Sequence, residues 1–249
     1  MIRRCLGGLA LAALVSCADE TVVAPLAERG AALARDPNVS GSQYNRFACT
    51  TCHVDRPAEA GERILPGAPL RGAARRPSYW NGETTHLREA VVRCWVHFMR
   101  GRAEDLEGPT GDALGAWLES LSPNGATEGT APIAHTWPRS TRDLGAGGDP
   151  ARGRVLYQRA CANCHGAFGS GQGRLGPLVS IVPQDTLAEH CQGELPAGVP
   201  DYASYARQVA YQKTRHGSFL GYAGSMPPFA TELLSDEEMA HIVALFRCP

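Results

Sequence analysis

The chain lacks an excess of charge of either sign. Among its 249 residues, 24 Lys and Arg stand against 25 Asp and Glu, which gives a formal net charge of −1 at pH 7. Proteins that bind nucleic acid through its phosphates need a concentrated positive field, and this balance does not supply one. We therefore expect no nucleic-acid partner.

The N-terminus also lacks an apolar run long enough to span a bilayer. A spanning helix needs about 20 apolar residues, whereas the run LGGLALAALV covers only residues 6–15 and follows Arg3 and Arg4. A positive start before a short apolar core is typical of a secretory signal peptide. We therefore predict a signal peptide over residues 1–16 and an exported chain.

The signal ends in LVSC, residues 14–17, which resembles the lipobox of bacterial lipoproteins. The resemblance implies that Cys17 becomes a lipidated first residue and tethers the chain to a membrane on the periplasmic side. Ala18 is not the aspartate that signals inner-membrane retention in some bacteria, which favours the outer membrane. The alternative is an ordinary signal peptide with an incidental cysteine.

Export to an oxidising compartment gives the nine cysteines a specific meaning, because exposed thiols form disulfides there. Cys5 leaves with the signal and Cys17 carries lipid. Seven cysteines remain: Cys49, Cys52, Cys94, Cys161, Cys164, Cys191 and Cys248. Seven is an odd number, so one of these cysteines must lack a partner of its own kind.

Four of the seven occur in two copies of a five-residue pattern, CTTCH at residues 49–53 and CANCH at residues 161–165. Two thiols three positions apart can bond to the two vinyl groups of a haem, while the adjacent imidazole reaches the iron. The pattern predicts two covalent haem c groups. Their attachment residues are Cys49 and Cys52 with ligand His53, and Cys161 and Cys164 with ligand His165.

Two other interpretations of paired cysteines fit less well. A redox CxxC expects alternating strands and helices, and a zinc ribbon expects its cysteine pairs about 15 to 20 residues apart. The two copies here begin 112 residues apart, with no strand pattern between them. A histidine directly after both copies favours haem.

With these motifs, the chain resembles the cytochrome c family over nearly all of its length after Cys17. The resemblance implies an all-α fold with two cytochrome c-like haem domains in tandem, over residues 17–121 and 149–249. An irregular linker over residues 122–148 is rich in Gly, Pro, Ser and Thr. Its Ile133 and Trp137 predict that part of it packs against the domains.

In the second half, Asp149 and Pro150 have the types expected at a helix start, and Val155, Leu156 and Ala160 form an apolar face of that helix. The helix leads into the second haem motif. RLGPLV, residues 174–179, is similar to the family's Gly-Pro turn. The resemblance implies that its proline packs beside His165 and that its carbonyl accepts the ring N–H.

GSMPPF, residues 224–229, resembles the family's loop that carries the sixth iron ligand, which implies that Met226 is that ligand. The alternative is a core methionine, with His190 or His216 on the iron. Ser235 and Glu238 predict a capping box for the last helix. Because thioether sulfur favours reduced iron, we expect the second haem to have the higher potential.

The first half has no comparable methionine loop. Helical patterns cover residues 28–36 and residues 111–121, the latter with Leu114, Trp117, Leu118 and Leu121 on its inward face. Candidates for the sixth ligand come from HLREAVVRCWVHFMRG, residues 86–101, and are His86, Cys94, His97 and Met99. Helical spacing places Cys94 with Val91 and Phe98 on the face expected to contact the haem.

Cys191 and Cys248 both lie in the second half, one in a loop and one next to the C-terminus, so a disulfide between them can hold the last helix. Cys94 is then the cysteine without a partner. A lone cysteine on a helix at this distance from the haem motif resembles thiosulfate dehydrogenases and related sulfur-oxidising dihaem cytochromes, whose His/Cys-ligated haem is the active site.

That resemblance implies Cys94 as ligand of the first haem, and Cys94 with Arg88 as candidate catalytic residues. Ala90 and Phe98 stand four positions before and after Cys94, where those enzymes hold their anionic substrate with arginines and a serine. Two alternatives remain, namely Met99 as ligand beside a buried Cys94 thiol, and Cys94 in a disulfide with Cys191 free.

A group of residues between the first motif and this helix is expected to cover the first haem's propionates, because buried carboxylates need donors. The group comprises Arg71, Arg75, Arg76, Tyr79 and Trp80.

The sequence thus predicts a membrane-tethered, periplasmic dihaem cytochrome that transfers electrons between redox partner proteins. A thiolate lowers the potential of its iron, so electrons are expected to enter at the first haem and leave through the second. The alternative is an enzyme that oxidises a sulfur oxyanion at the first haem.

Overall fold

A computed structural model describes residues 20–44, 46–56, 61–125, 127–140, 143–219, 222–223 and 226–249. The predicted signal peptide and Cys17 lie outside the described residues. No helix of the described segments combines the length and the apolar character that crossing a membrane requires.

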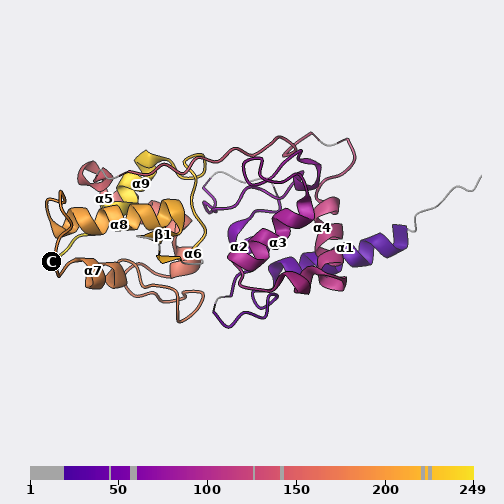
Figure 1. The fold of residues 1–249 in the computed structure, drawn as a ribbon, viewed down its shortest axis with the longest axis horizontal. Coiled ribbons are helices and arrows are strands. Elements are labelled where there is room, and N and C mark those ends of the chain that lie inside the picture. The colour runs from indigo at the N-terminus through magenta and orange to yellow at the C-terminus, as the bar shows by residue number, and fades with distance from the viewer. Residues whose placement is uncertain are drawn as a thin grey trace, which may run out of the picture.

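The described structure is helical and has two lobes, one from each half of the chain (Figure 1). The first lobe contains α1 (Glu20–Arg35), α2 (Cys49–Cys52), α3 (Leu87–His97) and α4 (Pro109–Ser120), with short 3-10 helices η1 (Ala73–Arg75) and η2 (Ala103–Leu106). The second contains η3 (Leu144–Gly147), α5 (Pro150–Ala160), α6 (Ala162–His165), α7 (Gln184–His190), α8 (Tyr202–His216) and α9 (Asp236–Val243). A two-residue hairpin, β1 (Ser218–Phe219) with β2 (Tyr222–Ala223), is the only sheet among the described residues. The all-α prediction is confirmed.

Helices α1 and α4 pack against each other in the first lobe. They pack so closely that a Cβ on Gly30 would lie 1.9 Å from the Ala113 carbonyl oxygen, so only glycine fits there. The predicted inward face of α4 is confirmed for Leu114, Trp117 and Leu118, which are all buried. Leu121, just beyond the helix, is half-buried.

In the second lobe, α5 begins as predicted, because the Asp149 carboxylate accepts a hydrogen bond from the Ala151 amide at 2.8 Å. Leu156 and Ala160 are buried against α9, but Val155 is 62% exposed. The prediction for Val155 is wrong because one residue turns a helix by about 100°, and Leu156 already takes the inward position. The capping box of α9, Ser235 with Glu238, is confirmed.

The sequence did not predict α8, although it is fifteen residues long. Its inward face consists mainly of small or polar-tipped residues, and Val209 is its only purely aliphatic side chain larger than alanine. The buried residues are Ser204, Ala206, Val209, Ala210, Tyr211 and Arg215. Helix-start chemistry is present, since the Asp201 carboxylate accepts a hydrogen bond from the Ser204 amide at 2.7 Å.

The two lobes meet where the two haem motifs lie (Figure 1, α2 and α6). The Asn163 side chain, inside CANCH, donates a hydrogen bond to the carbonyl of Thr51, inside CTTCH, at 3.1 Å. Arg63 donates to the other end of the Asn163 amide at 2.5 Å, and the Ile64 amide bonds to the Arg159 carbonyl at 3.0 Å. The two attachment motifs are therefore in direct contact.

The linker is fixed to both lobes. Asn81 of the first lobe donates to the His135 carbonyl at 2.8 Å and accepts from the His135 amide at 2.9 Å. The next residue, Thr136, bonds to the Thr231 amide at 3.0 Å and donates its own amide to Glu232 at 2.9 Å. Residues 135–136 thus join the lobes.

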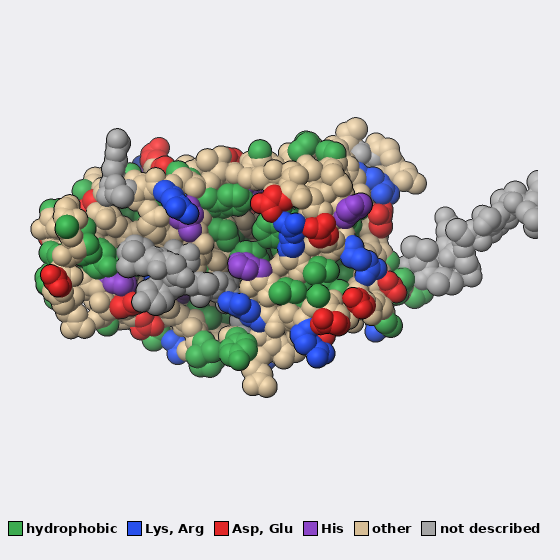
Figure 2. Space-filling model, viewed as in Figure 1, with side chains coloured by type: hydrophobic (Ala, Val, Ile, Leu, Met, Phe, Trp, Pro, Cys, Tyr) green, Lys and Arg blue, Asp and Glu red, His purple; other side chains and the backbone are tan. Residues whose placement is uncertain are grey.

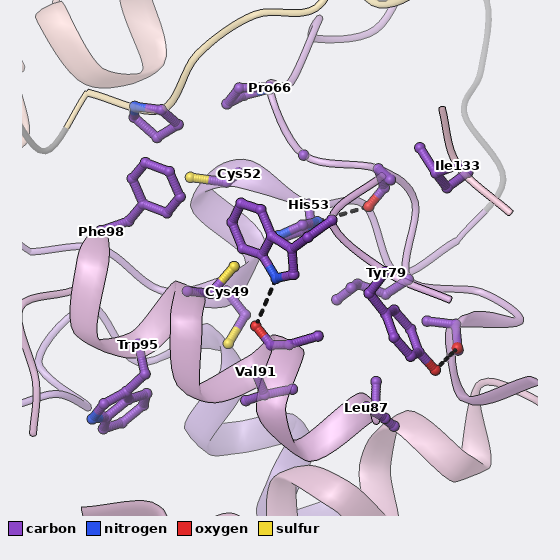
Figure 3. Close-up of a pocket in the computed structure, with 18 of the residues that line it drawn as sticks. Cys49, Cys52, His53, Pro66, Tyr79, Leu87, Val91, Trp95, Phe98 and Ile133 are labelled. Atoms are coloured by element: carbon purple, nitrogen blue, oxygen red, sulfur yellow. Dashed lines mark hydrogen bonds between the residues drawn. The ribbon is translucent and has the colours of Figure 1, made fainter. Parts of the chain in front are cut away.

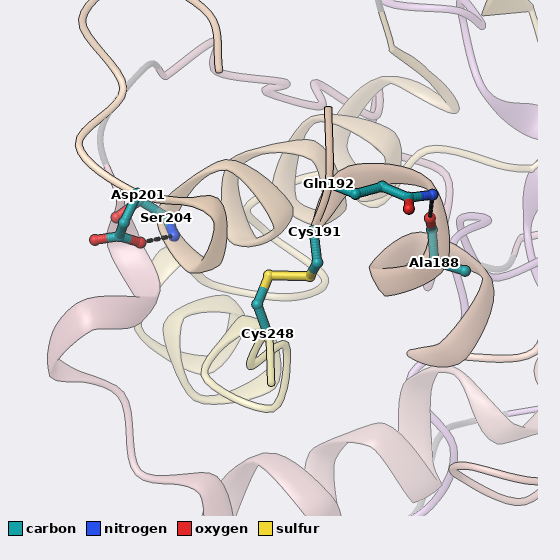
Figure 4. Close-up of a disulfide and its surroundings, with 6 residues drawn as sticks. All are labelled: Ala188, Cys191, Gln192, Asp201, Ser204 and Cys248. Carbon is teal, nitrogen blue, oxygen red and sulfur yellow. Dashed lines mark hydrogen bonds between the residues drawn. A yellow bond between two sulfur atoms is a disulfide. The ribbon is translucent and has the colours of Figure 1, made fainter. Parts of the chain in front are cut away.

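Cys191, directly after α7, forms a disulfide with Cys248, beyond α9, with their Cα atoms 5.5 Å apart (Figure 4). The bond holds the C-terminal segment against the end of α7. Cys94 is a free cysteine, so the alternative that placed it in a disulfide and left Cys191 free is wrong.

A largely buried ion pair fixes η3 to α8. The Asp143 carboxylate accepts hydrogen bonds from Arg207, from the Ser204 hydroxyl at 2.8 Å and from the Gly145 amide at 3.1 Å. Burial alone raises the pKa of Asp143, but the hydrogen bonds from Arg207 and Ser204 outweigh it and lower the pKa below its usual value.

We predict that Asp143→Asn lowers the free energy of unfolding at pH 7 by about 2 kcal/mol, because it leaves Arg207 without its charge partner. A carboxyl with a lowered folded pKa stabilises the fold above its unfolded pKa of about 3.9 and loses that effect as pH falls through the folded value. Denaturant titrations should therefore show the difference from wild type shrinking below pH 4.

Asp112→Asn is the matched control, because Asp112 pairs with Arg88 at the surface, where both side chains are more than half exposed. We expect a change of less than about 1 kcal/mol there. An equal loss in both variants would contradict the role given to Asp143.

Candidate functional site

Each lobe contains a cavity next to its CxxCH motif. The first cavity is lined by Cys49, Cys52 and His53 and by the inward face of α3, with Phe98 and Val91 beside the cysteines (Figure 3). Linker residues Ile133, His135 and Trp137 also line it. The prediction that Ile133 and Trp137 pack inward is confirmed, and the linker forms part of the cavity wall.

The second cavity is lined by Cys161, Cys164 and His165, with Met226 among the other lining residues. It is the larger of the two, about 790 Å³ against about 220 Å³. Its wall also includes first-lobe side chains such as Tyr44 and Val96, which are exposed. Figure 2 shows hydrophobic side chains in the hollow near the middle of the molecule. Both cavities are thus built at the junction of the lobes.

Three residues, Phe47, Pro66 and Pro227, line both cavities. Pro227 directly follows Met226, and Pro228 after it lines the first cavity. Residues 226–228 of the second lobe therefore contribute Met226 to the second cavity and Pro227 and Pro228 to the wall of the first. At Phe47, Pro66 and Pro227, one side chain faces both cavities.

The two motif histidines are held in the same way. His53 Nδ1 lies 2.7 Å from the Ala68 carbonyl oxygen, and His165 Nδ1 lies 2.8 Å from the Ser180 carbonyl oxygen. A carbonyl only accepts, so each Nδ1 carries the proton and each Nε2 keeps its lone pair. Nε2 is the atom that a metal would bind.

Burial lowers the pKa of both histidines, which keeps them neutral. Nearby Arg76 and His135 lower the pKa of His53 further, while the bond to Ala68 opposes the shift. Neutral imidazole is the form that ligates iron, so the electrostatics of both sites favour ligation.

The carbonyl that accepts from His165 is not the predicted one of the Gly-Pro turn. Pro177 of the Gly-Pro turn is exposed and does not line the cavity, and the acceptor is Ser180, three residues further on. The turn is closed by a hydrogen bond from the Val179 amide to the Gly176 carbonyl. The carbonyl that faces His165 is the one directly after this turn, that of Ser180.

The sequence did not predict the loop in the first lobe, residues 65–70, whose Ala68 carbonyl accepts from His53. A Cβ on Gly67 would lie 2.4 Å from the His53 ring, so glycine is required for the backbone to pass. The stretch LPGAPL, residues 65–70, carried the available signal, because glycine and proline mark a fixed loop.

The thiols of the two motifs are held in an apolar environment. Burial raises the pKa of Cys49 and Cys164 to about 11 and that of Cys161 to about 12, which favours the protonated thiol before any group is attached. All four motif cysteines are free of disulfides. No three His, Cys, Asp or Glu side chains cluster as a metal site within the described part of the chain.

In the first cavity, Cys94 and Met99 both line the wall, whereas His86 and His97 do not and are exposed. Cys94 is half-buried, close enough to Cys49 for their charges to interact, and burial raises its pKa to about 12. Met99 follows the end of α3 and is buried in the lobe's core. The structure thus narrows four candidates to two.

In the second cavity, Met226 lines the wall, and so does Met239 of α9, which is completely buried. The alternatives His190 and His216 do not line the cavity. His190 packs edge-on against Tyr205, and His216 Nε2 lies 3.3 Å from the Pro138 carbonyl. Met226 therefore remains the loop candidate for the ligand.

The arginines near Cys94 point elsewhere. Arg88 donates to the Leu106 carbonyl at 2.7 Å and pairs with Asp112, and it does not line the cavity. Arg93 pairs with Glu83 and Glu89. The structure therefore does not bring Arg88 to the position that a catalytic role requires.

The residues present fit a covalently attached haem in each cavity. Each site offers two free thiols three positions apart, an imidazole with a free Nε2, and a cavity wall of mainly apolar side chains. The paired cysteines would hold the group, and the histidine would bind its iron.

Comparison with known proteins gives a family match within the second half of the chain. Residues 148–245 match the family described as "Cytochrome C oxidase, cbb3-type, subunit III". This match covers the second CxxCH motif and Met226.

Curated relatives include two thiosulfate dehydrogenases. That of Stutzerimonas stutzeri is 31% identical over 150 residues, which is 59% of this chain and 47% of the relative. That of Allochromatium vinosum is 33% identical over 130 residues, 51% of this chain and 47% of the relative. This chain spans about half the length of the curated relatives that it matches.

Among solved structures, the thiosulfate dehydrogenase (TsdBA) of Marichromatium purpuratum aligns with 90% of this chain and 46% of its own, at 21% identity and a TM-score of 0.43.

Gly217 fixes the position of Met226. It ends α8 with φ of 69°, and a Cβ there would lie 2.3 Å from the Met226 carbonyl oxygen. We predict that Gly217→Ala shifts Met226 and weakens the absorption band of a methionine–iron bond in the oxidised protein. Left-handed strain and the clash should also cost about 1 kcal/mol or more of unfolding free energy.

Gly198→Ala is the matched control, because Gly198 has φ of 84° with nothing within 4 Å of its added Cβ. It carries the backbone strain alone and should leave the band intact. Loss of the band in both variants, or in neither, would argue against Gly217 as the residue that places Met226.

Proposed function

We propose that this chain, a cytochrome distantly similar to thiosulfate dehydrogenases, carries two haem c groups and moves single electrons between its two lobes. Its second lobe is a haem-binding cytochrome c domain, and the function of such domains is electron transfer. Each bound haem supplies a one-electron Fe³⁺/Fe²⁺ couple.

The observation that carries the proposal is the contact between the two attachment motifs. Asn163 of CANCH bonds to Thr51 of CTTCH, and Phe47, Pro66 and Pro227 form a wall common to both cavities. At these three residues, single side chains would separate two groups bound to these motifs. That arrangement suits electron transfer between the two haems better than it suits two haems that act independently.

We further propose that Cys94 ligates the first iron. Its thiol lies on the cavity face of α3 and has no disulfide, and Cys191 and Cys248, the other two described cysteines outside the motifs, are bonded to each other. A thiolate ligand lowers the potential of its iron, and a Met226 thioether raises that of the second. Electrons would then enter at the first site and leave from the second to a redox partner protein.

A second candidate is oxidation of a sulfur oxyanion at the first site. Similarity to two thiosulfate dehydrogenases favours it, since it extends over 51 to 59% of this chain. Against it, neither Arg88 nor Arg93 reaches the cavity. The electron-transfer function is therefore the better supported of the two.

For location, we propose export and a lipid anchor at Cys17, on the periplasmic side of a membrane. The support is the sequence of residues 1–17, namely two arginines, a short apolar run and LVSC. Wild-type protein should incorporate a labelled fatty acid during growth, and the Cys17→Ala variant should not.

The number of haems tests the proposal directly. We expect two haems per polypeptide by pyridine haemochrome assay of the purified protein. The double variant Cys161→Ala/Cys164→Ala should retain one, because it keeps Cys49 and Cys52. The control Cys191→Ala/Cys248→Ala should retain two at lower thermal stability. A wild-type ratio of one would overturn the two-haem proposal.

The first iron's ligand can be identified by electron paramagnetic resonance of the oxidised protein. We expect Cys94→Ala to abolish a thiolate-type low-spin signal and Met99→Leu to preserve it. The converse result would assign Met99 instead. Thiosulfate-dependent reduction of an added electron acceptor by wild type, lost in Cys94→Ala, would favour the enzyme over the electron carrier.

A further inference from the structure

Arg76 is a buried cation without a carboxylate partner. Its side chain is 8% exposed, lines the first cavity and donates only to carbonyls, those of Gly129 at 2.7 Å, Pro69 at 2.5 Å and Arg71 at 3.4 Å. No ion pair to Arg76 occurs among the described residues. A buried charge that is balanced only by neutral dipoles leaves a positive potential in the cavity.

The other arginines expected to neutralise the first haem are already neutralised. Arg71 pairs with Glu128 at 2.8 Å and Arg75 with Glu119 at 2.7 Å, and neither lines the cavity. The expectation that all three arginines serve the propionates is therefore wrong for two of them. Arg76 is the arginine whose charge is directed to the cavity.

Trp137 of the linker adds a donor without an acceptor. Its indole Nε1 is buried and has no hydrogen-bond partner within the described structure. Three other donors of aromatic side chains in this wall are satisfied: Tyr79 by the Ala73 carbonyl, Trp80 by the Ala90 carbonyl, and Trp95 by Asp105. An unsatisfied buried donor costs about 1 to 3 kcal/mol, which favours a ligand that accepts from it.

His135 places the two donors in the same part of the cavity. Its ring packs edge-on against Trp137 with centroids 5.6 Å apart, and it interacts electrostatically with Arg76. The acidic group that faces it, Glu232, is already bound by the amide of Thr136. The part of the cavity around Arg76, His135 and Trp137, called this corner below, therefore offers positive charge and N–H donors but no free carboxylate among the described residues.

We propose that Arg76 and Trp137 bind a carboxylate of the group in the first cavity, namely a propionate of its haem. The inference rests on the first haem of the proposed function. A carboxylate accepts several hydrogen bonds and carries the charge that Arg76 lacks. The linker between the lobes thus becomes part of the haem site, held there by Asn81 on one side and Thr231 on the other.

The test is the reduction potential of the first haem, measured by titration with electron paramagnetic resonance detection. Trp137→Phe removes one N–H, so more negative charge stays near the iron, the oxidised state is favoured and the potential falls. Arg76→Gln removes a full charge and should lower it further. The potential of the second haem should stay at its wild-type value in both variants.

Trp95→Phe is the matched control, because Trp95 lines the same cavity but its N–H already bonds to Asp105 at 3.3 Å. It should cost stability and leave the potential unchanged. If Arg76→Gln fails to fold, Trp137→Phe alone decides. If Trp137→Phe retains two haems and the potential of its first haem is unchanged, this inference is overturned and the proposed function stands. If the purified wild-type protein carries no haem at the first site, both are contradicted.

A dissolved oxyanion could occupy the same corner. In that case added thiosulfate or sulfate would shift the wild-type potential, and Trp137→Phe would remove the response. This result would overturn the propionate assignment. We expect the wild-type potential to be independent of these anions at constant ionic strength.

Discussion

The contact between the two CxxCH motifs is the constraint on which the arrangement of the molecule depends. Asn163 donates to the Thr51 carbonyl and accepts from Arg63, so one amide joins the middle of one motif to the middle of the other. The Ile64 amide adds a bond to the Arg159 carbonyl of the second lobe. With the lobes joined in this way, Phe47, Pro66 and Pro227 line both cavities. Electron transfer needs closeness, and here it is built into the attachment segments themselves.

Within each lobe, a backbone carbonyl sets the tautomer of the motif histidine. The bonds from His53 to Ala68 and from His165 to Ser180 select the same tautomer in two loops of different sequence. In the first lobe the approach depends on Gly67, which no other residue can replace without striking the ring. In the second, the acceptor carbonyl also lies 15 positions after its histidine, but the loop passes an exposed Pro177 on the way. Two loops of different sequence thus hold the proton on Nδ1 of the motif histidine in both lobes.

The sequence predicted the features that local chemistry determines. The CxxCH motifs, the caps at Asp149 and Ser235, and the inward face of α4 depend on residues close together in the chain. It failed where the contact is between distant segments or where the pattern is weak. Helix α8 was missed because its buried face has Val209 as its only aliphatic side chain larger than alanine. Val155 was misplaced because its neighbour Leu156 is the residue that meets α9. The linker's role in the first cavity needed the pairing of Asn81 with His135, which sequence spacing cannot show.

The first cavity differs from the second in a way that bears on function. Its wall combines a free cysteine, a buried unpaired arginine and a linker strand that carries an indole N–H without an acceptor. A site for binding a dissolved anion would need such donors near the sixth iron position, on the face of α3 that carries Cys94. The arginines of α3 instead pair with Asp112, Glu83 and Glu89 on the outside of the lobe. The positive charge that remains comes from Arg76, which is anchored beside η1 and the linker rather than on α3. The charge distribution of this lobe is therefore suited to holding a carboxylate-bearing group in place, and it provides less for capturing an anionic substrate beside Cys94.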